Sequence, residues 1–183
     1  MKYFTAQLWA DINSPNSNSA AKQWDENVEN YREALTAILP KMNPHARRFF
    51  RDMSLHDGTL TLMELGDRID DTDGNWQRGD VKHRKTDVRL RVLSAEGDFI
   101  FTLQYKKVTR VEVRFPGEVL FPAGRWPNFG DWGYDELAEV EEGIFRHEVL
   151  FSSGATILIE FARFSFKRSP AREIVPRRKK SSG

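Results

Sequence analysis

The chain has 183 residues, 39% of them hydrophobic and 12% aromatic, and its formal net charge is +1. This length fits one domain, and the apolar content is sufficient for one hydrophobic core. The absence of cysteine excludes disulfides, thiolate chemistry and cysteine-based zinc sites, and no apolar stretch approaches the about 20 residues of a membrane helix.

Residues 1–53 have the periodicity of helices. Thr5 is suited to cap a short helix that runs to Ile12, and the turn-forming segment SPNSNS ends it. Pro40 ends a second helix, and Asn43-Pro44 has the form of the N-cap and first residue of a third. The second helix has an apolar residue every three or four positions, as one face of an α-helix requires; these residues are Trp24, Val28, Tyr31, Leu35 and Ile38.

From Leu55 onward the apolar residues recur with a period of two, which indicates β-strands. The strand-like runs are LTLMEL, DVRLRVL, DFIFTLQY, VTRVEVRF, IFRHEVLF and ATILIEFARFSF. Short turns such as SAEGD and SSGA separate several of them, and short turns connect antiparallel strands. We therefore predict an α+β fold: an N-terminal helical layer packed on a mostly antiparallel, curved sheet of about six or seven strands.

The predicted helical layer should cover one face of the sheet. The helical side chains expected to face the sheet are Trp24, Tyr31, Leu35, Phe49 and Phe50. The strand residues expected to meet them include Leu60, Leu62, Phe101, Leu103 and Phe161. These contacts would form a single core.

Two long loops interrupt the predicted sheet, at residues 66–86 and 116–134. Loops longer than about 12–15 residues are commonly functional. The aromatic residues at the second loop exceed what a plain connection needs; they are Phe121, Trp126, Phe129, Trp132 and Tyr134. If exposed, they would form a protein-binding surface, because Trp and Tyr are enriched in binding hot spots. If folded back, they would cap one end of the sheet.

The region that overlaps and follows this loop is rich in carboxylates. They are Asp131, Asp135, Glu136, Glu139, Glu141 and Glu142. A pair of carboxylates suits glycosidase-type chemistry, but their density alone does not indicate it. We expect a solvated acidic face, which would also attract a basic protein partner.

The pair His56-Asp57 stands where helical spacing changes to strand spacing. Imidazole and carboxylate ligands suit Zn, Mn or Fe, and His147 in a later strand would complete a metal set of His56, Asp57 and His147, with Glu160 as a further ligand. This set requires the strands that contain the two histidines to be neighbours. The alternative is structural: Asp57-Gly58 turns the chain, His56 bonds to a neighbouring element, and His147 belongs to an apolar strand face.

Other motifs point away from catalysis. The segment DDTDGNW begins like an EF-hand calcium loop, but Trp76 stands where that loop needs Gly, and Lys82 where it needs Glu. We find no Gly-rich phosphate loop, serine-nucleophile elbow or helical HExxH motif in the sequence. The sequence therefore favours a protein that is not an enzyme and uses no cofactor.

Residues 167–183 contain seven basic residues and one acidic residue, a net charge of +6, which leaves −5 for residues 1–166. Their two prolines and scarce apolar residues predict a disordered tail. We expect one α+β domain over residues 1–166, helical at 1–53 and β at 54–166, followed by this tail. Its basic residues would add weak affinity for nucleic-acid phosphates.

Four segments resemble a bacterial sequence type: YFTAQLW at residues 3–9, WDENVENYREAL at 24–35, SLHDGTL at 54–60 and HEVLFSSGATILIEF at 147–161. They resemble an uncharacterised bacterial family, a domain of unknown function, whose members open with Y-F-T-x-x-L-W and have an L-H-D step into a β-sheet. The resemblance implies bacterial origin and a helix-then-sheet fold, without catalytic residues. In size and style the chain is also similar to bacterial immunity proteins, which bind and block a toxin.

Three functional hypotheses follow. The first is a non-enzymatic, immunity-like domain that binds a protein partner through the aromatic loop and the acidic region. The second is a metal-dependent hydrolase built on His56, Asp57 and His147, and the third is association with nucleic acid through the basic tail. Because residues 1–9 lack the pattern of a secretory signal, we expect a cytoplasmic protein without membrane contact.

Overall fold

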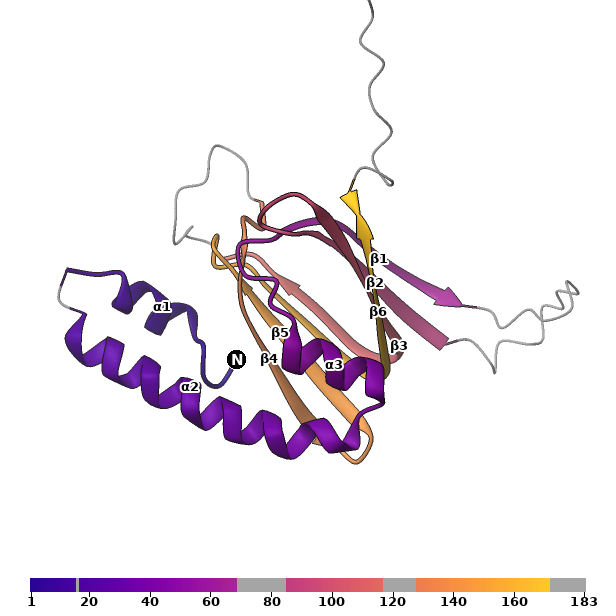
Figure 1. Ribbon diagram of the computed structural model, residues 1–183, viewed down its shortest axis with the longest axis horizontal. Coiled ribbons are helices and arrows are strands. Elements are labelled where there is room, and N and C mark those ends of the chain that lie inside the picture. Colours follow the sequence, from indigo (N-terminus) through magenta and orange to yellow (C-terminus); the bar gives the residue numbers. More distant parts are fainter. Residues whose placement is uncertain (16, 69–84, 117–127, 172–183) are drawn as a thin grey trace, which may run out of the picture.

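The computed structural model describes residues 1–15, 17–68, 85–116 and 128–171, which Figure 1 shows with their elements labelled. The elements in chain order are α1 (Ala6–Ile12), α2 (Asn18–Ile38), the 3-10 turn η1 (Leu39–Lys41), α3 (Pro44–Asp52), β1 (Thr59–Arg68), β2 (Lys85–Leu93), β3 (Phe99–Arg114), β4 (Trp132–Glu141), β5 (Ile144–Phe151) and β6 (Thr156–Pro170). This order confirms the predicted α+β class with its helices first. No helix among these is long and apolar enough to cross a membrane.

α1 and α3 begin at the caps that the sequence predicts, whereas α2 begins at Asn18, inside the predicted turn SPNSNS, and Pro40 lies in the 3-10 turn η1 that follows it. The Thr5 hydroxyl accepts a hydrogen bond from the Leu8 N–H at 3.2 Å and caps α1. Asn43 accepts from the Ala46 N–H at 3.0 Å and caps α3, whose first residue is proline. In both cases a side-chain oxygen satisfies an N–H that the first turn of a helix leaves without a backbone partner.

The six strands form one sheet in the order β1-β2-β3-β6-β5-β4, and every pairing is antiparallel. Two meanders, β1-β2-β3 and β4-β5-β6, join through β3 and β6. The sheet is not closed, although an isolated bridge between Thr59 and Asp131 links the two edge strands at one end. The predicted antiparallel sheet is therefore confirmed, with six strands.

β3 is one strand where the sequence predicts two. The runs DFIFTLQY and VTRVEVRF are continuous, and the register against β6 shifts between Val108 and Arg110. Lys107 has φ 54° at this point. An added residue reverses the alternation of side chains, which makes one bulged strand look like two strands in the sequence.

β4 was missed by sequence reasoning, which assigned its residues to a loop and a solvated acidic face. Its sequence WGYDELAEVE lacks alternation, and the register against β5 shifts at both of its ends. Two of its carboxylates face into the protein, since Asp135 contacts His147 and Glu136 is buried. The prediction of a solvated face is wrong for these two residues.

A bulge also changes which residues of β1 face the helices. Leu60 pairs with the buried Val92, whereas Leu62 pairs with Arg91 on the opposite face. The prediction that both leucines face the core is therefore wrong for Leu62. Beyond the bulge, Leu65 returns to the face of Leu60.

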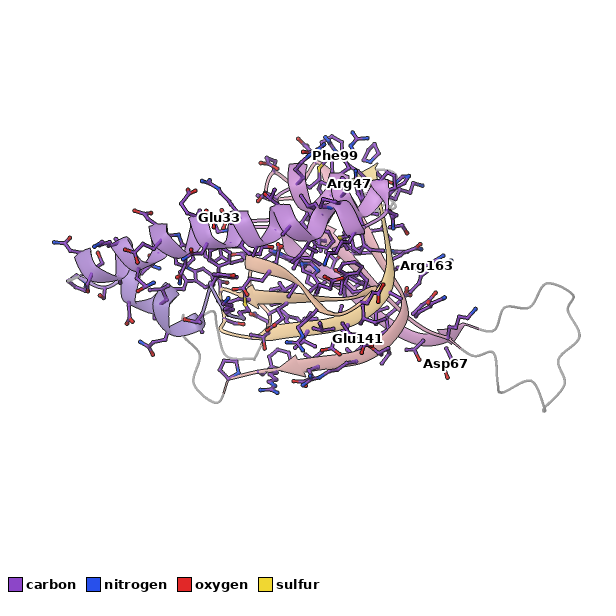
Figure 2. The ribbon with its side chains drawn as sticks, turned by 90° about the horizontal axis from the view of Figure 1, so that it is seen from below. Glu33, Arg47, Asp67, Phe99, Glu141 and Arg163 are labelled. Carbon is purple, nitrogen blue, oxygen red and sulfur yellow. The ribbon has the colours of Figure 1, made fainter. Side chains whose placement is uncertain are left out.

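The core lies between the sheet and α3. We call the face of the sheet that α3 covers the inner face and the opposite one the outer face. Phe49 and Phe50 of α3 pack with ring centroids 5.1 Å and 5.0 Å from Phe164 of β6. Figures 1 and 2 both place the helices on one side of the sheet. The inner face contains the fully buried side chains Val88, Leu90, Leu103, Tyr105, Ile159 and Phe161.

The predicted packing holds for α3 and in part for α2. Leu35 of α2 packs against the buried core, whereas Trp24 and Tyr31 reach the sheet only at β4. No residue of α2 is fully buried, and Trp24 and Tyr31 contact Phe4 at ring distances of 5.1 Å and 5.3 Å rather than the centre of the sheet. The boundary at residue 166 also moves, because β6 continues to Pro170 and Lys167 and Arg168 pair with β3.

Candidate functional site

His56 and Asp57 fasten the chain before β1 to the start of β4. His56 Nδ1 lies 2.6 Å from the backbone oxygen of Gly133. The Asp57 N–H donates to the oxygen of Trp132 at 2.8 Å, and the Trp132 N–H donates to the oxygen of Gly58 at 2.7 Å. Asp57 has φ 61°, a left-handed conformation that Asp tolerates better than most residues. The pair therefore closes one end of the sheet, as the structural alternative predicts.

His147 lies in the core, inside a network of polar side chains. The Tyr105 hydroxyl is 2.7 Å from His147 Nδ1. His147 Nε2 has no aligned hydrogen-bond partner but lies 3.3 Å from Asp135 Oδ1. The indole N–H of Trp132 donates to Asp135 Oδ2 at 2.8 Å. Tyr105, His147, Asp135 and Trp132 form what we call the core network.

The surroundings of the core network set its protonation. Burial, and then the charge of Asp135, raise the pKa of Tyr105 well above its usual value, so its hydroxyl stays protonated 2.7 Å from His147 Nδ1. Burial by itself raises the pKa of Asp135, but the contact with His147, the charge of His147 when protonated and the Trp132 N–H together lower it.

The core network contains residue types that are common in active sites, but a substrate could not reach its histidine. The side chains of Tyr105, His147 and Trp132 are buried, and only Asp135 is partly exposed, at 28%. A reacting group must reach both its base and its substrate, and here the base is enclosed by rings such as Phe50, 5.0 Å from His147. The network therefore holds the strands together.

The structure does not assemble the predicted metal set. Within the described ranges, no group of three or more His, Cys, Asp or Glu side chains could hold a metal ion. Glu160 binds Arg146 at 2.7 Å on the outer face, whereas His147 lies on the inner face. Successive residues of a strand point to opposite faces, so neighbours in sequence such as His147 and Glu148 are separated by the sheet.

Two of the predicted partner-binding aromatics lie inside or against the core. Trp132 is fully buried, so it is not part of an exposed binding surface. Phe129 stacks between Phe115 and Phe151, with its ring centroid 4.9 Å from each. These two residues match the alternative, in which the loop caps one end of the sheet.

Tyr134 is the centre of an aromatic cluster that joins the helices to β4. Its ring lies 5.5 Å from Phe4, 5.2 Å from Trp9, 4.5 Å from Trp24 and 5.1 Å from His56. Burial raises the pKa of Tyr134, and Asp57 adds to the effect. The predicted binding residue therefore binds the protein's own helices.

Glu136 holds the first residues of the chain. Its carboxylate accepts hydrogen bonds from the backbone N–H groups of Lys2 at 2.7 Å, Tyr3 at 2.7 Å and Phe4 at 2.6 Å. Several N–H donors to one carboxylate compensate for its burial. Its neighbour Glu139 forms an ion pair with Lys41, so two residues of the predicted acidic face fix segments that precede the sheet.

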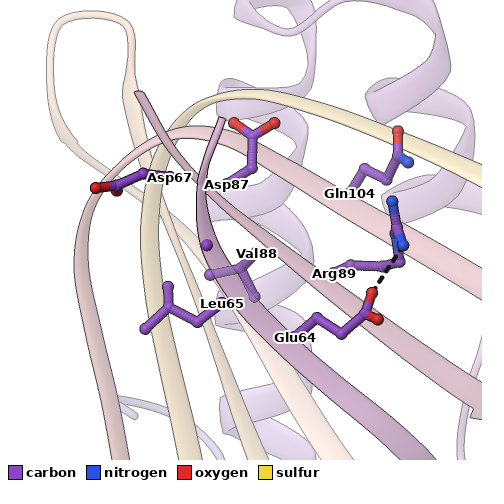
Figure 3. Close-up of a pocket in the computed structure, with 8 residues that line it drawn as sticks. Glu64, Leu65, Asp67, Asp87, Val88, Arg89 and Gln104 are labelled. Carbon is purple, nitrogen blue, oxygen red and sulfur yellow. Dashed lines mark hydrogen bonds and ion pairs between the residues drawn. The ribbon is translucent and has the colours of Figure 1, made fainter. Parts of the chain in front are cut away.

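An exposed corner remains where β1 and β2 extend past the helices. Leu65 of β1 lies on the inner face and is 59% exposed. A hollow of 490 Å³ adjoins it, lined by Glu64, Leu65, Gly66, Asp67, Asp87, Val88, Arg89 and Gln104, and Figure 3 shows these side chains. Figure 2 shows Asp67 beyond the ends of the helices, which explains why Leu65 is left uncovered.

The remaining predictions fall outside the described residues. These are Phe121 and Trp126 of the aromatic loop, the segment DDTDGNW, and residues 172–183 of the basic tail.

Sequence reasoning missed Gly133, Asp135 and Leu65 as residues with special roles. Asp135 had no signal, because it sat in an acidic run. Gly133 did have a signal in the sequence, because a glycine between Trp132 and Tyr134 suggests that another element approaches the strand closely. Leu65 could not be found, since its exposure depends on where the helices end.

Comparison with known proteins finds no relative: no protein-family model, curated protein or solved structure matches the chain.

Proposed function

We propose that this chain is a non-enzymatic binding domain, of the same kind as bacterial immunity proteins, and that its partner is an extended segment of another protein. The segment adds to the free edge of β1. The observation that supports this most is the uncovered Leu65 on an edge strand, beside a hollow.

The edge of β1 has the properties of a strand-addition site. β1 pairs with β2 on one side, and on its other side the described chain provides only the bridge at Thr59. An edge strand presents free N–H and C=O groups, which an extended peptide can pair with. The opposite edge is occupied, because the Tyr31 hydroxyl accepts from the Leu137 N–H of β4 at 2.8 Å.

The charges around the hollow define the chemistry of the partner. Glu64, Asp67 and Asp87 line it, and Arg89 is the single cation among its described lining residues. Arg89 pairs with Glu64 at 2.7 Å, and Figure 3 shows this contact. A segment that alternates apolar and basic side chains would bury Leu65 and approach the carboxylates.

The two histidines of the predicted metal set both make structural contacts, which supports a non-enzymatic role. His56 binds the backbone of β4 and His147 belongs to the core network. The resemblance to an uncharacterised bacterial family and to immunity proteins adds bacterial origin to the proposal. A cytoplasmic location is part of the same proposal.

Photo-crosslinking in bacterial cells tests the site. A photo-reactive residue replaces Leu65 in one variant and, as a matched control, the 38% exposed Val140 of β4 in another. We expect one dominant protein adduct from position 65 and none from position 140. Mass spectrometry of the crosslinked peptide should locate an extended basic segment.

The dissociation constant for the purified partner then shows whether Leu65 contributes to binding or only lies near the crosslinked protein. Leu65→Lys should weaken binding at least tenfold, because burial of a leucine contributes about 1.5–3 kcal/mol, whereas Val140→Lys should change it less than twofold. Wild-type affinity in Leu65→Lys contradicts the proposal. If the only crosslinked product is a dimer of this chain, the edge of β1 is a site of self-association.

A further inference from the structure

The outer face of the sheet has two halves that differ in charge. Strand register places three rows across β2, β3 and β6: Arg91-Thr102-Lys167, Arg89-Gln104-Ser165 and Asp87-Lys106-Arg163. The residues between them, such as Val88, Leu90 and Leu103, are buried on the inner face, so these rows point outward. Glu64 of β1 extends the middle row and pairs with Arg89. We call these three rows the basic face.

The cations of the basic face are mostly without counter-charges. Arg91, Lys106, Arg163 and Lys167 form no ion pair with any described residue, whereas Arg89 pairs with Glu64 at 2.7 Å. The carboxylates on these rows are Glu64 and Asp87, against five cations. Four unpaired cations on one surface repel one another, and such a cost is offset when a polyanion binds.

The other half of the outer face has matched charges. Arg146 pairs with Glu160 at 2.7 Å, and Arg110 and Arg114 each pair with Glu112. The same sheet therefore neutralises its arginines in one half and leaves the cations unpaired in the other. This contrast makes the basic face a distinct feature rather than a general property of the strands.

We propose that the basic face binds nucleic acid through its phosphates, without reading the bases. Strands lie about 5 Å apart, and the four residue steps from Arg163 to Lys167 span about 13 Å. A duplex of that length has about eight phosphate charges. The patch is therefore large enough to contact several phosphates at once.

The side chains between the cations fit this occupant. Thr102, Gln104 and Ser165 are uncharged hydrogen-bonding groups, which commonly contact phosphate and sugar oxygens. The three rows contain no aromatic residue, so they offer no platform for base stacking. Figure 3 shows Arg89 and Gln104 side by side on this face. Anchoring on a lipid surface usually adds several buried apolar or aromatic side chains; the three rows across β2, β3 and β6 contain none, and on β1 the apolar Leu62 pairs with Arg91 on this face.

The test compares two triple variants of the full chain that lose the same charge. Lys106, Arg163 and Lys167 are changed to Gln in one. In the control, Arg32, Arg51 and Arg114 are changed to Gln; each is exposed and pairs with a carboxylate. A third variant changes Arg177, Arg178, Lys179 and Lys180 to Gln, which removes the basic tail as a source of affinity. Circular dichroism and thermal midpoints show that the variants fold.

Binding is measured with a fluorescent 20-base-pair DNA duplex over a series of salt concentrations. Three lost phosphate contacts should reduce the slope of log K against log salt by about 2.5 and weaken binding more than tenfold at low salt. The control should keep the wild-type slope. Duplexes of different sequence should bind equally, because the face has no means of base readout.

Three results overturn the proposal. If both triple variants weaken equally, only net charge matters; if the tail variant alone loses binding, the tail is the site. If the wild type binds a poly-glutamate peptide or anionic lipid vesicles but not the duplex, the partner is an acidic protein or a lipid surface. The basic face shares Glu64, Asp87, Arg89 and Gln104 with the hollow beside Leu65. Failure at Leu65 still leaves this outcome unaffected, since Leu65 lies on the inner face and the three substituted cations Lys106, Arg163 and Lys167 do not line the hollow.

Discussion

Asp135 illustrates how a carboxylate is kept against a core. It accepts a hydrogen bond from the Trp132 indole N–H at 2.8 Å, and His147 Nε2 lies 3.3 Å from it without an aligned hydrogen bond; the Tyr105 hydroxyl lies 2.7 Å from the other ring nitrogen of His147. A buried charge costs several kcal/mol unless it is hydrogen-bonded. The indole and imidazole therefore compensate for the partial burial of Asp135, and removal of any member leaves another without a partner.

The first prediction concerns the acid stability that Asp135 provides. Its pKa is lowered by His147 and Trp132 against the opposing effect of burial. Its contribution to stability is therefore complete above its unfolded pKa of about 3.9 and is lost as the pH falls through the lower folded value. Urea unfolding between pH 7 and pH 2.5 should show that wild type loses more free energy than Asp135→Asn in the acid range.

The control for this experiment is Asp131→Asn, which removes an exposed carboxylate from the start of the same strand. It should keep the wild-type acid dependence. Identical acid slopes in wild type and Asp135→Asn would show that the lowered pKa contributes nothing to stability.

At the scale of elements, α1 and β4 meet at a position that has no room for a side chain. A Cβ on Gly133 would lie 2.4 Å from Trp9 Cη2 and 2.9 Å from the backbone oxygen of Leu150. The Trp9 ring can approach β4 this closely only because residue 133 is a glycine. The aromatic cluster around Tyr134 depends on this close approach, since Trp9 is one of its members.

The second prediction follows from this contact. Gly133→Ala should lower the free energy of unfolding by about 1–3 kcal/mol, because overpacking displaces neighbouring groups. Gly66→Ala in β1 is the matched control, since nothing lies within 4 Å of its added Cβ. Urea denaturation followed by tryptophan fluorescence measures both, and equal stability of the two variants would mean that α1 moves aside without cost.

At the scale of the molecule, packing is uneven between the helices and the sheet. α1 and α2 contain no fully buried residue, whereas β2, β3 and β6 contribute most of the buried inner face. α2 reaches the sheet through β4, by the aromatic cluster and the Tyr31 to Leu137 bond. Segments with few buried contacts open more easily than the core.

The third prediction is a gradient of amide protection across the protein. We expect hydrogen exchange to be fastest in α1 and the first half of α2, and slowest in β3 and β6, which lie at the centre of the sheet. Mass spectrometry of exchanged peptides resolves these segments. Uniform protection of α2 and β3 would show that the whole chain opens only as one unit.

Particular elements show how far sequence reasoning reached. Thr5 and Asn43 were identified as helix caps because a cap requires only local geometry. The alternative that places His147 on an apolar strand face is confirmed, and it could be predicted because alternation is also local. β4 and the bulges of β1 and β3 were missed, because a bulge and an inward carboxylate both break the alternation that identifies a strand.

For the candidate site, sequence reasoning selected the right segments but assigned some of their residues the wrong roles. His56, Trp132 and Tyr134 do meet, yet they meet one another and the helices rather than a metal or a partner. Which aromatic side chains are left exposed depends on how far each helix extends over the sheet, and no local pattern contains that information.

The sequence by itself determined the fold class, the caps of α1 and α3 and the antiparallel character of the sheet, since each follows from propensity, capping and periodicity over short stretches. Only the tertiary structure decided that Leu65 lies uncovered, that Asp135 faces inward, and that four cations share one unpaired surface. The reason is physical: burial and charge pairing depend on neighbours that are distant in the chain, and strand order with its bulges decides which residues become neighbours.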